Sequence, residues 1–459
     1  MTDALLKSGL TALQDGDLYT CLRNFTRALA TETNHATAYV YLGNYYSTIS
    51  DDDLAIRCYV RAQLLDPHLV DSYYNESNLH QSRRRFADAE AKLLAAIALD
   101  PASPQVITNL TAVQHSLGAS ALATINGYQR SLKLKPHNNH RASVNLGQAL
   151  LSLGRFMEGW PAFHSRFLVE TPALKSTLPF YGGGKTDSKI IVWGEQGVGD
   201  QIMFLSMLND LVEACPNVTF RGDRRLKTLC RRTFPTVRFQ SDDSEFRQAD
   251  FDLQVALGDL GGILRNSVSD FPITPSFMTV EINQYEVLTR ELRTKSSIVN
   301  IGISWRSTNK DTGGQRTVDL RDMLEAFRQD NVNFINLQYD GTTHETATIR
   351  SASCDRNTHR PTEEGIDRHN DLDGVACLAA ACDLVISIGN TVAHISAAVG
   401  TETWVLVPEP PGWRWMAAGT RTRWYPAVKI FRQSTRDSWQ SVLGQVRVAL
   451  SERLLSRQI

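Results

Sequence analysis

A glycine-rich loop that ends in a carboxylate has the residue types needed for acid–base chemistry. The segment GEQGVGD (194–200) follows a β-rich run at 189–193 and precedes an apolar stretch with helical spacing. Glycines allow a tight turn and a close approach of backbone to ligand, and a helix N-terminus attracts negative charge. A carboxylate that projects from such a loop into a cleft can serve as a general base. Asp is also a preferred helix N-cap, so the spacing leaves both roles open for Asp200.

Two later segments offer groups that bind phosphate. Arg306 and Lys310 follow the β-rich run 298–305, with Arg316 further on. An arginine fork and a lysine ammonium beyond a strand end can neutralise a diphosphate. The run 383–388 leads into GNTVAH (389–394), where Asn390 or Thr391 can cap a helix whose free N–H groups make a second phosphate site. A buried packing role is the alternative for the histidine of this segment, His394.

Short β-rich runs and helical stretches alternate around these motifs, which predicts parallel sheets. Stretches such as 201–214, 320–329 and 375–381 have helical spacing. A proline-containing stretch at 271–275 and a polar segment at 294–297 indicate a break near residue 285. We therefore expect two Rossmann-like halves facing each other across a cleft, with ligands at the carboxyl ends of the strands. The expected strands are 189–193, 218–221, 251–256, 298–305, 333–337, 383–388, 403–407 and 429–432.

The first 137 residues repeat. Ala28, Ala62 and Ala96 are 34 residues apart, and Pro67 and Pro101 keep this spacing. The pattern resembles the tetratricopeptide repeat, with four units from about residue 4 to 136 and a degenerate fifth to about residue 166. Stacked helix pairs can bind an extended peptide on their concave face, or they can act only as a scaffold. Candidate peptide contacts are Tyr39, Asn44, Tyr46, Tyr73, Asn75 and Asn78.

Composition excludes several classes of protein. The 459 residues carry 48 Lys plus Arg against 49 Asp plus Glu, a net charge of −1, which argues against a general nucleic-acid binder. No apolar run approaches the ~20 residues that span a bilayer. The seven cysteines contain no CxxC pair, so we expect reduced thiols, no structural zinc and a cytoplasmic location.

Several motifs in order resemble one family. They are VWGEQGVGDQIMFLSML, IGISWRSTNK, FINLQYD and DLVISIGNTVAHISAAVGTETWVLVPEPPGWRW. They resemble the bacterial tetratricopeptide-repeat glycosyltransferases, whose C-terminal domain is similar to the lipopolysaccharide heptosyltransferases of GT-B fold. The resemblance implies a repeat α-solenoid followed by two Rossmann-like α/β domains. The expected parts are the repeats (1–137), connecting helices (138–170), a linker or ordered crossing loop (171–188), an acceptor-side half (189–285), a donor-side half (286–433) and a C-terminal helix (434–459).

The resemblance also implies roles for single residues. Asp200 corresponds to the family's proposed catalytic base, and Gln338 stands where the heptosyltransferases often carry an acid near the donor nucleoside. Glycine stands at position 389 in place of the family's aspartate, which points to a changed donor or to lost activity. The implied donor-binding residues are Arg306, Lys310, Gln338, Asn390, Thr391 and His394, and the loop beside the base contributes Glu195, Gln196, Gly197 and Gly199.

The predicted function is an inverting, metal-independent transfer of sugar from a nucleotide-diphospho sugar to an acceptor, with a protein docked on the repeats as the expected acceptor. No cofactor is expected beyond this co-substrate. Asp371 and Asp373 form a DxD pair, which we interpret as a helix cap or turn. The alternative is a non-catalytic adaptor whose degenerate transferase domain binds a sugar or a nucleotide. The residues do not identify the donor nucleotide, the sugar or the acceptor.

Overall fold

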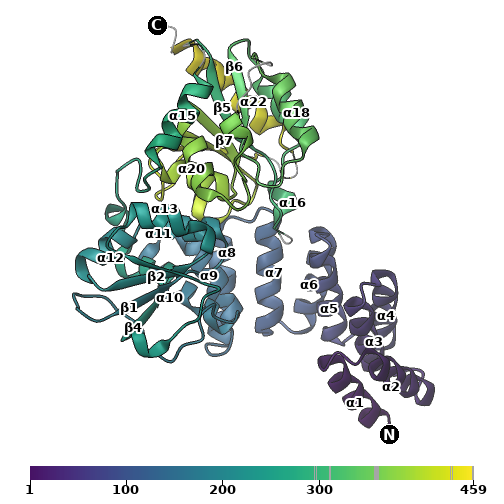
Figure 1. Cartoon of the computed structure of the whole chain (residues 1–459). Coiled ribbons are helices and arrows are strands. Elements are labelled where there is room, and N and C mark those ends of the chain that lie inside the picture. The colour runs from purple at the N-terminus through teal and green to yellow at the C-terminus, as the bar shows by residue number, and fades with distance from the viewer. Residues whose placement is uncertain are drawn as a thin grey trace. The chain divides into compact units, whose positions relative to one another are not determined.

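The computed structural model describes residues 1–293, 295, 297–309, 312–355, 361–434, 436 and 438–456 (Figure 1). The chain separates into two compact units, Met1–Leu146 and Gly147–Ile459. No helix within the described ranges is long and apolar enough to cross a membrane.

The first unit is a helical solenoid of tetratricopeptide type, as the spacing predicts. Its helices pair consecutively along the chain, α1 with α2 and α3 with α4. The first helices of successive pairs begin at residues 2, 36, 70 and 104, which preserves the 34-residue register. The helices are α1 (Thr2–Gln14), α2 (Leu18–Thr31), α3 (Ala36–Thr48), α4 (Asp52–Leu65), α5 (Val70–Ser82), α6 (Phe86–Leu99), α7 (Pro104–Ser116) and α8 (Ala121–Leu134).

Small residues make the close contacts inside these hairpins. Ala28, Ala62 and Ala96 are fully buried at equivalent positions of the second helices. A Cβ atom on Gly43 would lie 2.6 Å from the Tyr59 ring, so only glycine allows α3 to approach α4 this closely. Small residues at these positions therefore let the paired helices pack closely.

The second unit begins with a helical segment that precedes the sheets. It comprises the last part of α9 (His140–Ser152), then α10 (Phe156–His164) and the 3₁₀ turn η1 (Ser165–Leu168). A Cβ on Gly147 would lie 2.5 Å from the backbone nitrogen of Phe163, so α9 and α10 also cross closely. The indole of Trp160 donates to the carbonyl of Arg265 at 2.8 Å, which ties this helix pair to the α/β part of the unit.

The first sheet is parallel, with strand order β3-β2-β1-β4. Its strands are β1 (Ile190–Trp193), β2 (Val218–Gly222), β3 (Arg238–Ser241) and β4 (Leu253–Ala256). The sequence did not predict β3, because this edge strand has no buried residue and no apolar alternation. The helix expected at 201–214 is two helices, α11 (Val198–Leu205) and α12 (Leu208–Ala214).

The segment 171–188 is an ordered crossing along β4, one of the two forms expected for it. The backbone nitrogen of Gln254 donates to the Pro179 carbonyl at 3.0 Å, and that of Tyr181 donates to the Gln254 carbonyl at 2.8 Å. The Gln254 side chain adds a bond to the Leu178 carbonyl at 2.6 Å.

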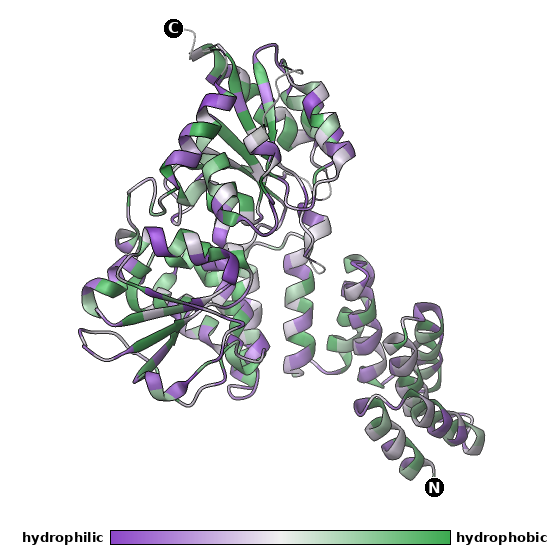
Figure 2. Ribbon diagram, viewed as in Figure 1, coloured by the Kyte–Doolittle hydropathy of each residue, from purple (hydrophilic) through white to green (hydrophobic). Residues whose placement is uncertain are grey.

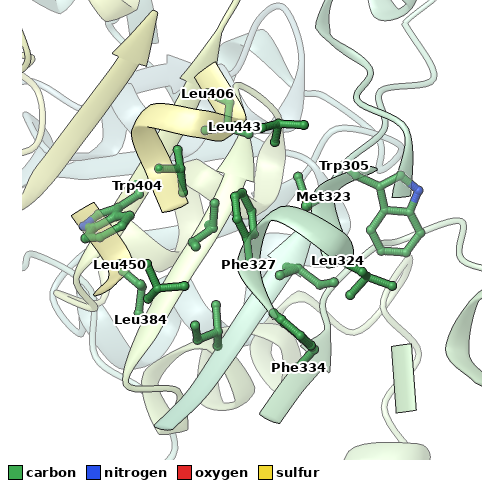
Figure 3. Packing of buried hydrophobic residues seen from close by; sticks show 14 of the residues in the cluster. Trp305, Met323, Leu324, Phe327, Phe334, Leu384, Trp404, Leu406, Leu443 and Leu450 are labelled. Atoms are coloured by element: carbon green, nitrogen blue, oxygen red, sulfur yellow. The ribbon is translucent and has the colours of Figure 1, made fainter. Parts of the chain in front are cut away.

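The second sheet is also parallel, with strand order β6-β5-β7-β8-β9. Its central strands are buried along their whole length. In Figure 2 the helices beside this sheet mix hydrophilic and hydrophobic residues. Figure 3 shows its core, in which Phe327, Trp404 and Leu450 pack with residues of the strands. The strands are β5 (Val299–Ser304), β6 (Val332–Asn336), β7 (Leu384–Ile388), β8 (Thr403–Val407) and β9 (Val428–Arg432). The main helices are α15 (Ile282–Leu292), α17 (Leu320–Phe327), α18 (Thr343–Ala352), α20 (Leu372–Ala381), α21 (Thr391–Ala398) and α22 (Gln440–Ser456).

The break expected near residue 285 falls inside a helix. Residue 285 belongs to α15, which packs against α20 beside the second sheet. The connection between the two sheets is instead the non-helical run that precedes α15. The prolines at 272 and 275 lie in this run, whereas the polar segment expected to mark the break, 294–297, falls partly outside the described residues.

Candidate functional site

A pocket of about 480 Å³ lies where the carboxyl ends of strands from both sheets meet. Residues after β1 and β2 line one side, and residues after β5, β6, β7 and β8 line the other. This is where parallel α/β sheets bind ligands, because loops and helix N-termini converge at these strand ends. Among the described residues, the lining includes Gly197, Gly199, Asp200, Arg225, Thr308, Arg316, Tyr339, Arg368, Gly389, Asn390, Thr391, His394, Arg414 and Trp415.

Asp200 lines this pocket and does not cap its helix. The N-cap of α11 is Gly197, so Asp200 lies in the first turn. Its Oδ1 accepts a hydrogen bond from Nε of Arg414, a residue that follows β8 in the other half of the unit. Of the two roles left open for Asp200, the structure excludes the cap. The role of general base stays a prediction.

The N-termini of α11 and α21 approach each other closely beside Asp200. A Cβ on Gly199 would lie 2.9 Å from Cδ2 of His394 and 3.5 Å from Cα of Thr391. A larger residue at 199 would therefore push the two helices apart. The glycine at this position serves helix packing as well as the turn.

His394 is both buried and part of the pocket wall. Its Nδ1 lies 2.9 Å from the Tyr425 hydroxyl, and its ring stacks on Trp415 with centroids 5.0 Å apart. Burial lowers the pKa of His394 to about 4; Asp200 opposes this shift and Arg414 adds to it. The imidazole is therefore neutral near pH 7, so it can bind a ligand by hydrogen bonding but not as a cation.

Gly389 has a structural reason to lack a side chain. A Cβ at this position would lie 2.6 Å from Nε1 of Trp415. The aspartate that the family resemblance leads one to expect here does not fit beside this indole. An aromatic side chain thus forms the wall where the resemblance implies a carboxylate.

Four arginines line the pocket among its described residues, against the single carboxylate of Asp200. Of these, the sequence indicated Arg316 as a possible phosphate ligand, and its Nη1 donates to the Gly389 carbonyl at 3.3 Å. Burial lowers the pKa of Arg316, and the neighbouring Arg414 lowers it further. Arg225 is paired with Asp223 at 2.6 Å, and Arg368 donates to the Asn336 carbonyl at 2.5 Å. These arginines come from loops far apart in sequence, so local spacing does not show that they line one pocket.

The Arg306 side chain forms ion pairs with two carboxylates that are not in the described lining of the pocket. Its guanidinium pairs with Asp340 at 3.0 Å and with Glu345 at 2.6 Å. The bond from Arg306 lowers the pKa of Glu345 to about 2. Arg306 is not among the described residues that line the pocket, so the structure does not place it at the expected phosphate site. Lys310, the second expected cation, lies outside the described residues.

Gln338 also has a supporting role in place of the expected ligand contact. Its buried Oε1 accepts from the Ser304 hydroxyl at 2.9 Å and from the backbone nitrogens of Trp305 and Arg306 at 3.0 Å each. These bonds hold the loop after β5. The neighbouring Tyr339 is the residue that lines the pocket, and its hydroxyl accepts from the backbone nitrogen of Thr308 at 2.8 Å.

Asn390 and Thr391 lie at the pocket as expected. Asn390 is the N-cap of α21, with Oδ1 accepting from the Val392 nitrogen at 3.0 Å, and its Nδ2 donates to the Ser304 hydroxyl at 2.7 Å. Thr391 is the first residue of the helix. Backbone N–H groups in a first helical turn have no intrahelical acceptor and attract anions. This helix end therefore offers donors to a negatively charged ligand.

The four loop residues before Asp200 divide between the pocket and the core. Gly197 and Gly199 line the pocket, whereas Gln196 contacts it through Arg414, whose Nη2 donates to Oε1 at 2.8 Å. Glu195 is buried and accepts two bonds from Arg166 on η1, at 2.7 and 2.5 Å. The loop that carries Asp200 is thus anchored to the helical segment before the sheets.

The DxD pair is used for capping and for an ion pair. Asp371 is the N-cap of α20 and accepts from the Gly374 nitrogen at 2.9 Å, which confirms the cap interpretation. Asp373 pairs with Arg232 at 2.5 Å.

The chain has similarity to known proteins over both units, but no family model matches it. It is 28% identical to Protein FlbA of Caulobacter vibrioides over 498 aligned residues, which cover 95% of this chain and 82% of that protein. It is 27% identical to human tetratricopeptide repeat protein 28 over 167 residues, which cover 36% of this chain and 7% of that protein.

Solved structures match with low overall similarity. Pilf of Pseudomonas aeruginosa has a TM-score of 0.35 and 19% identity, over 51% of this chain and 92% of that one. The Cut9–Hcn1 structure of the APC/C has a TM-score of 0.35 and 20% identity, over 38% of this chain and 34% of that one.

Proposed function

We propose that the chain is a glycosyltransferase that uses a nucleotide-diphospho sugar, with the two α/β halves arranged as in GT-B enzymes. The observation that carries the proposal is the pocket at the carboxyl ends of both sheets. It combines an excess of guanidinium groups, the N-terminus of α21 and one carboxylate. This combination suits a diphosphate leaving group beside a proton acceptor.

The proposed reaction needs no metal. The acceptor hydroxyl oxygen attacks the anomeric carbon while the bond from that carbon to the diphosphate oxygen breaks. Asp200 takes the hydroxyl proton, and Arg316 with the α21 N-terminus stabilises the negative charge that develops on the diphosphate. His394, neutral and bonded to Tyr425, is available for hydrogen bonding to the sugar or the phosphate.

Measurements of sugar-nucleotide binding, followed by assays of sugar transfer, test this proposal. Isothermal titration with ADP-, UDP-, GDP- and CMP-sugars should identify a donor that binds the full chain. Asp200→Asn should bind the donor at least as tightly as wild type and lose transfer by roughly 10²–10⁴-fold, the usual contribution of a general base. Unchanged turnover in this variant would remove Asp200 from the mechanism.

We further propose that the repeats bind a protein, which serves as acceptor or partner. Stacked helical repeats present an extended surface for such a partner. Asn44 and Asn78 form hydrogen bonds within the solenoid, to Tyr59 at 2.9 Å and to Asn109 at 2.8 Å, whereas half-buried Asn75 and Tyr39 remain candidates for peptide contact.

A truncated chain tests this role of the repeats. A fragment of residues 138–459 retains α9 and its contact with α10. It should bind donor normally but fail to glycosylate protein. Undiminished protein glycosylation by a folded fragment would return the repeats to a scaffolding role.

A non-catalytic adaptor is the second candidate. Two observations favour it: Trp415 occupies the space beside Gly389, and Asp200 is paired with Arg414. This candidate predicts that sugar nucleotides bind but are neither transferred nor hydrolysed.

A further inference from the structure

Arg414 is one of the four arginines in the described lining of the pocket, and it pairs with the single carboxylate of that lining, Asp200. Its Nε donates to Asp200, and its Nη2 donates to the Gln196 side chain at 2.8 Å. The guanidinium lies over the Trp413 ring at 4.8 Å from the centroid. The side chains of Arg414 and Asp200 are 20% and 18% exposed, so the pair is partly shielded from solvent while both residues line the pocket.

The backbone that carries Arg414 is firmly held. The residue lies on η6 (Trp413–Trp415), and Arg432 at the end of β9 bonds the loop that follows. The Arg432 guanidinium donates to the carbonyls of Trp415 and Gly419 at 2.6 Å each and to that of Met416 at 2.9 Å. With the loop fixed, a change of partner by Arg414 needs only side-chain rotation.

An anion bound in the pocket would compete with Asp200 for this guanidinium, since both residues line the pocket. Arg316 lines the same pocket as both residues, so the described lining places a second guanidinium there to attract negative charge. A planar guanidinium binds phosphate oxygens as well as it binds a carboxylate.

We propose that Arg414 exchanges Asp200 for the phosphate groups of an anionic ligand. In the ligand-free protein the ion pair restrains the Asp200 carboxylate. When a diphosphate binds, Arg414 turns to it and leaves Asp200 free to accept a proton. The identity of the ligand as a donor diphosphate rests on the proposed function, but the exchange itself concerns any pyrophosphate-like anion.

The exchange is tested by measuring the affinity of the full chain for inorganic pyrophosphate. Apparent affinity falls in proportion to the population of the competent state. If Arg414 spends about nine-tenths of its time on Asp200, then Asp200→Asn should bind pyrophosphate about ten-fold more tightly than wild type. Arg414→Gln should bind it about ten-fold more weakly, because a charge-assisted contact is lost. In the double variant, Asp200→Asn should give a much smaller gain than it gives alone.

The matched control is Asp210→Asn, which makes the same change of charge. Asp210 is 45% exposed and pairs with Arg265 outside the pocket, so its replacement should leave pyrophosphate affinity unchanged. Tryptophan fluorescence verifies that each variant is folded, since all eight tryptophans lie beyond residue 146.

The outcomes separate the exchange from the proposed function. Equal or weaker binding by Asp200→Asn than by wild type overturns the exchange and leaves the anion site standing. The absence of binding in every variant overturns both the exchange and the donor site. The expected pattern of affinities without transfer from any sugar nucleotide supports the exchange and refutes the glycosyltransferase proposal.

Discussion

Replacing Arg166 should unfold the second unit at markedly lower denaturant concentration. The side chains of Arg166 and Glu195 are 5% and 6% exposed, and they share two hydrogen bonds. Asp259 lies 2.8 Å from the same guanidinium, which also lies 4.4 and 4.0 Å from the ring centroids of Phe163 and Phe167. Arg166→Met would leave the Glu195 carboxylate buried without this cation.

The expected loss in the free energy of unfolding is about 3–5 kcal/mol, the usual cost of removing one partner from a buried ion pair. Adding Glu195→Gln should recover part of this loss, because no charge is then left at that position. The exposed pair Arg155–Glu158 is the control, with side chains 39% and 55% exposed. Arg155→Met should cost less than about 1 kcal/mol.

Guanidinium titrations followed by tryptophan fluorescence give these free energies for the second unit alone, since the first 146 residues contain no tryptophan. A loss below about 1 kcal/mol for Arg166→Met would refute the reasoning. So would a double variant no more stable than Arg166→Met itself, since the uncompensated charge would then not be the cause.

Three further predictions concern other parts of the chain. Gly43→Ala should destabilise the repeat unit by about 1–3 kcal/mol in far-ultraviolet circular dichroism melts, because its Cβ would lie 2.6 Å from the Tyr59 ring. Gly389→Ala should shift Trp415, with a similar loss of stability and a changed tryptophan emission; an unchanged spectrum would contradict the close packing. Burial lowers the pKa of His394 from 6.5 to about 4, so the folded form stays neutral while the unfolded form takes up a proton below pH 6.5. Wild type should therefore lose about 2–3 kcal/mol relative to His394→Gln between pH 7 and pH 4.5, and parallel pH profiles of the two proteins would refute this.

The local spacing of residues was sufficient to predict the repeats and most of the strands. Each helical hairpin of 34 residues needs a small buried residue at the same position. The spacing of Ala28, Ala62 and Ala96 was therefore enough to predict the repeat and its register. The buried strands of the second sheet are mostly apolar, because helices cover both faces of the sheet. The exposed edge strand β3 lacks this pattern and was missed.

Part of the pocket was also determined by position along the chain. Asp200, Asn390, Thr391 and His394 lie in the loop or first helical turn that follows a strand, and parallel strands bring their carboxyl ends to one edge of a sheet. Their position after predicted strands was therefore enough to predict that these four residues lie in the pocket, without knowledge of the side chains around them.

The partners of the charged residues were decided by tertiary structure alone. Arg306 follows a strand as Asp200 does, yet Asp340 and Glu345 bind it away from the pocket. Arg414 lies near the end of a segment quoted for the family resemblance, but nothing in that segment indicates that the fold brings it to Asp200, 214 residues earlier in the chain. Hydrophobic spacing is a local property and specifies helices and strands. Ion pairing depends on which side chains the packed elements bring within a few ångströms, so these contacts could be assigned only from the folded chain.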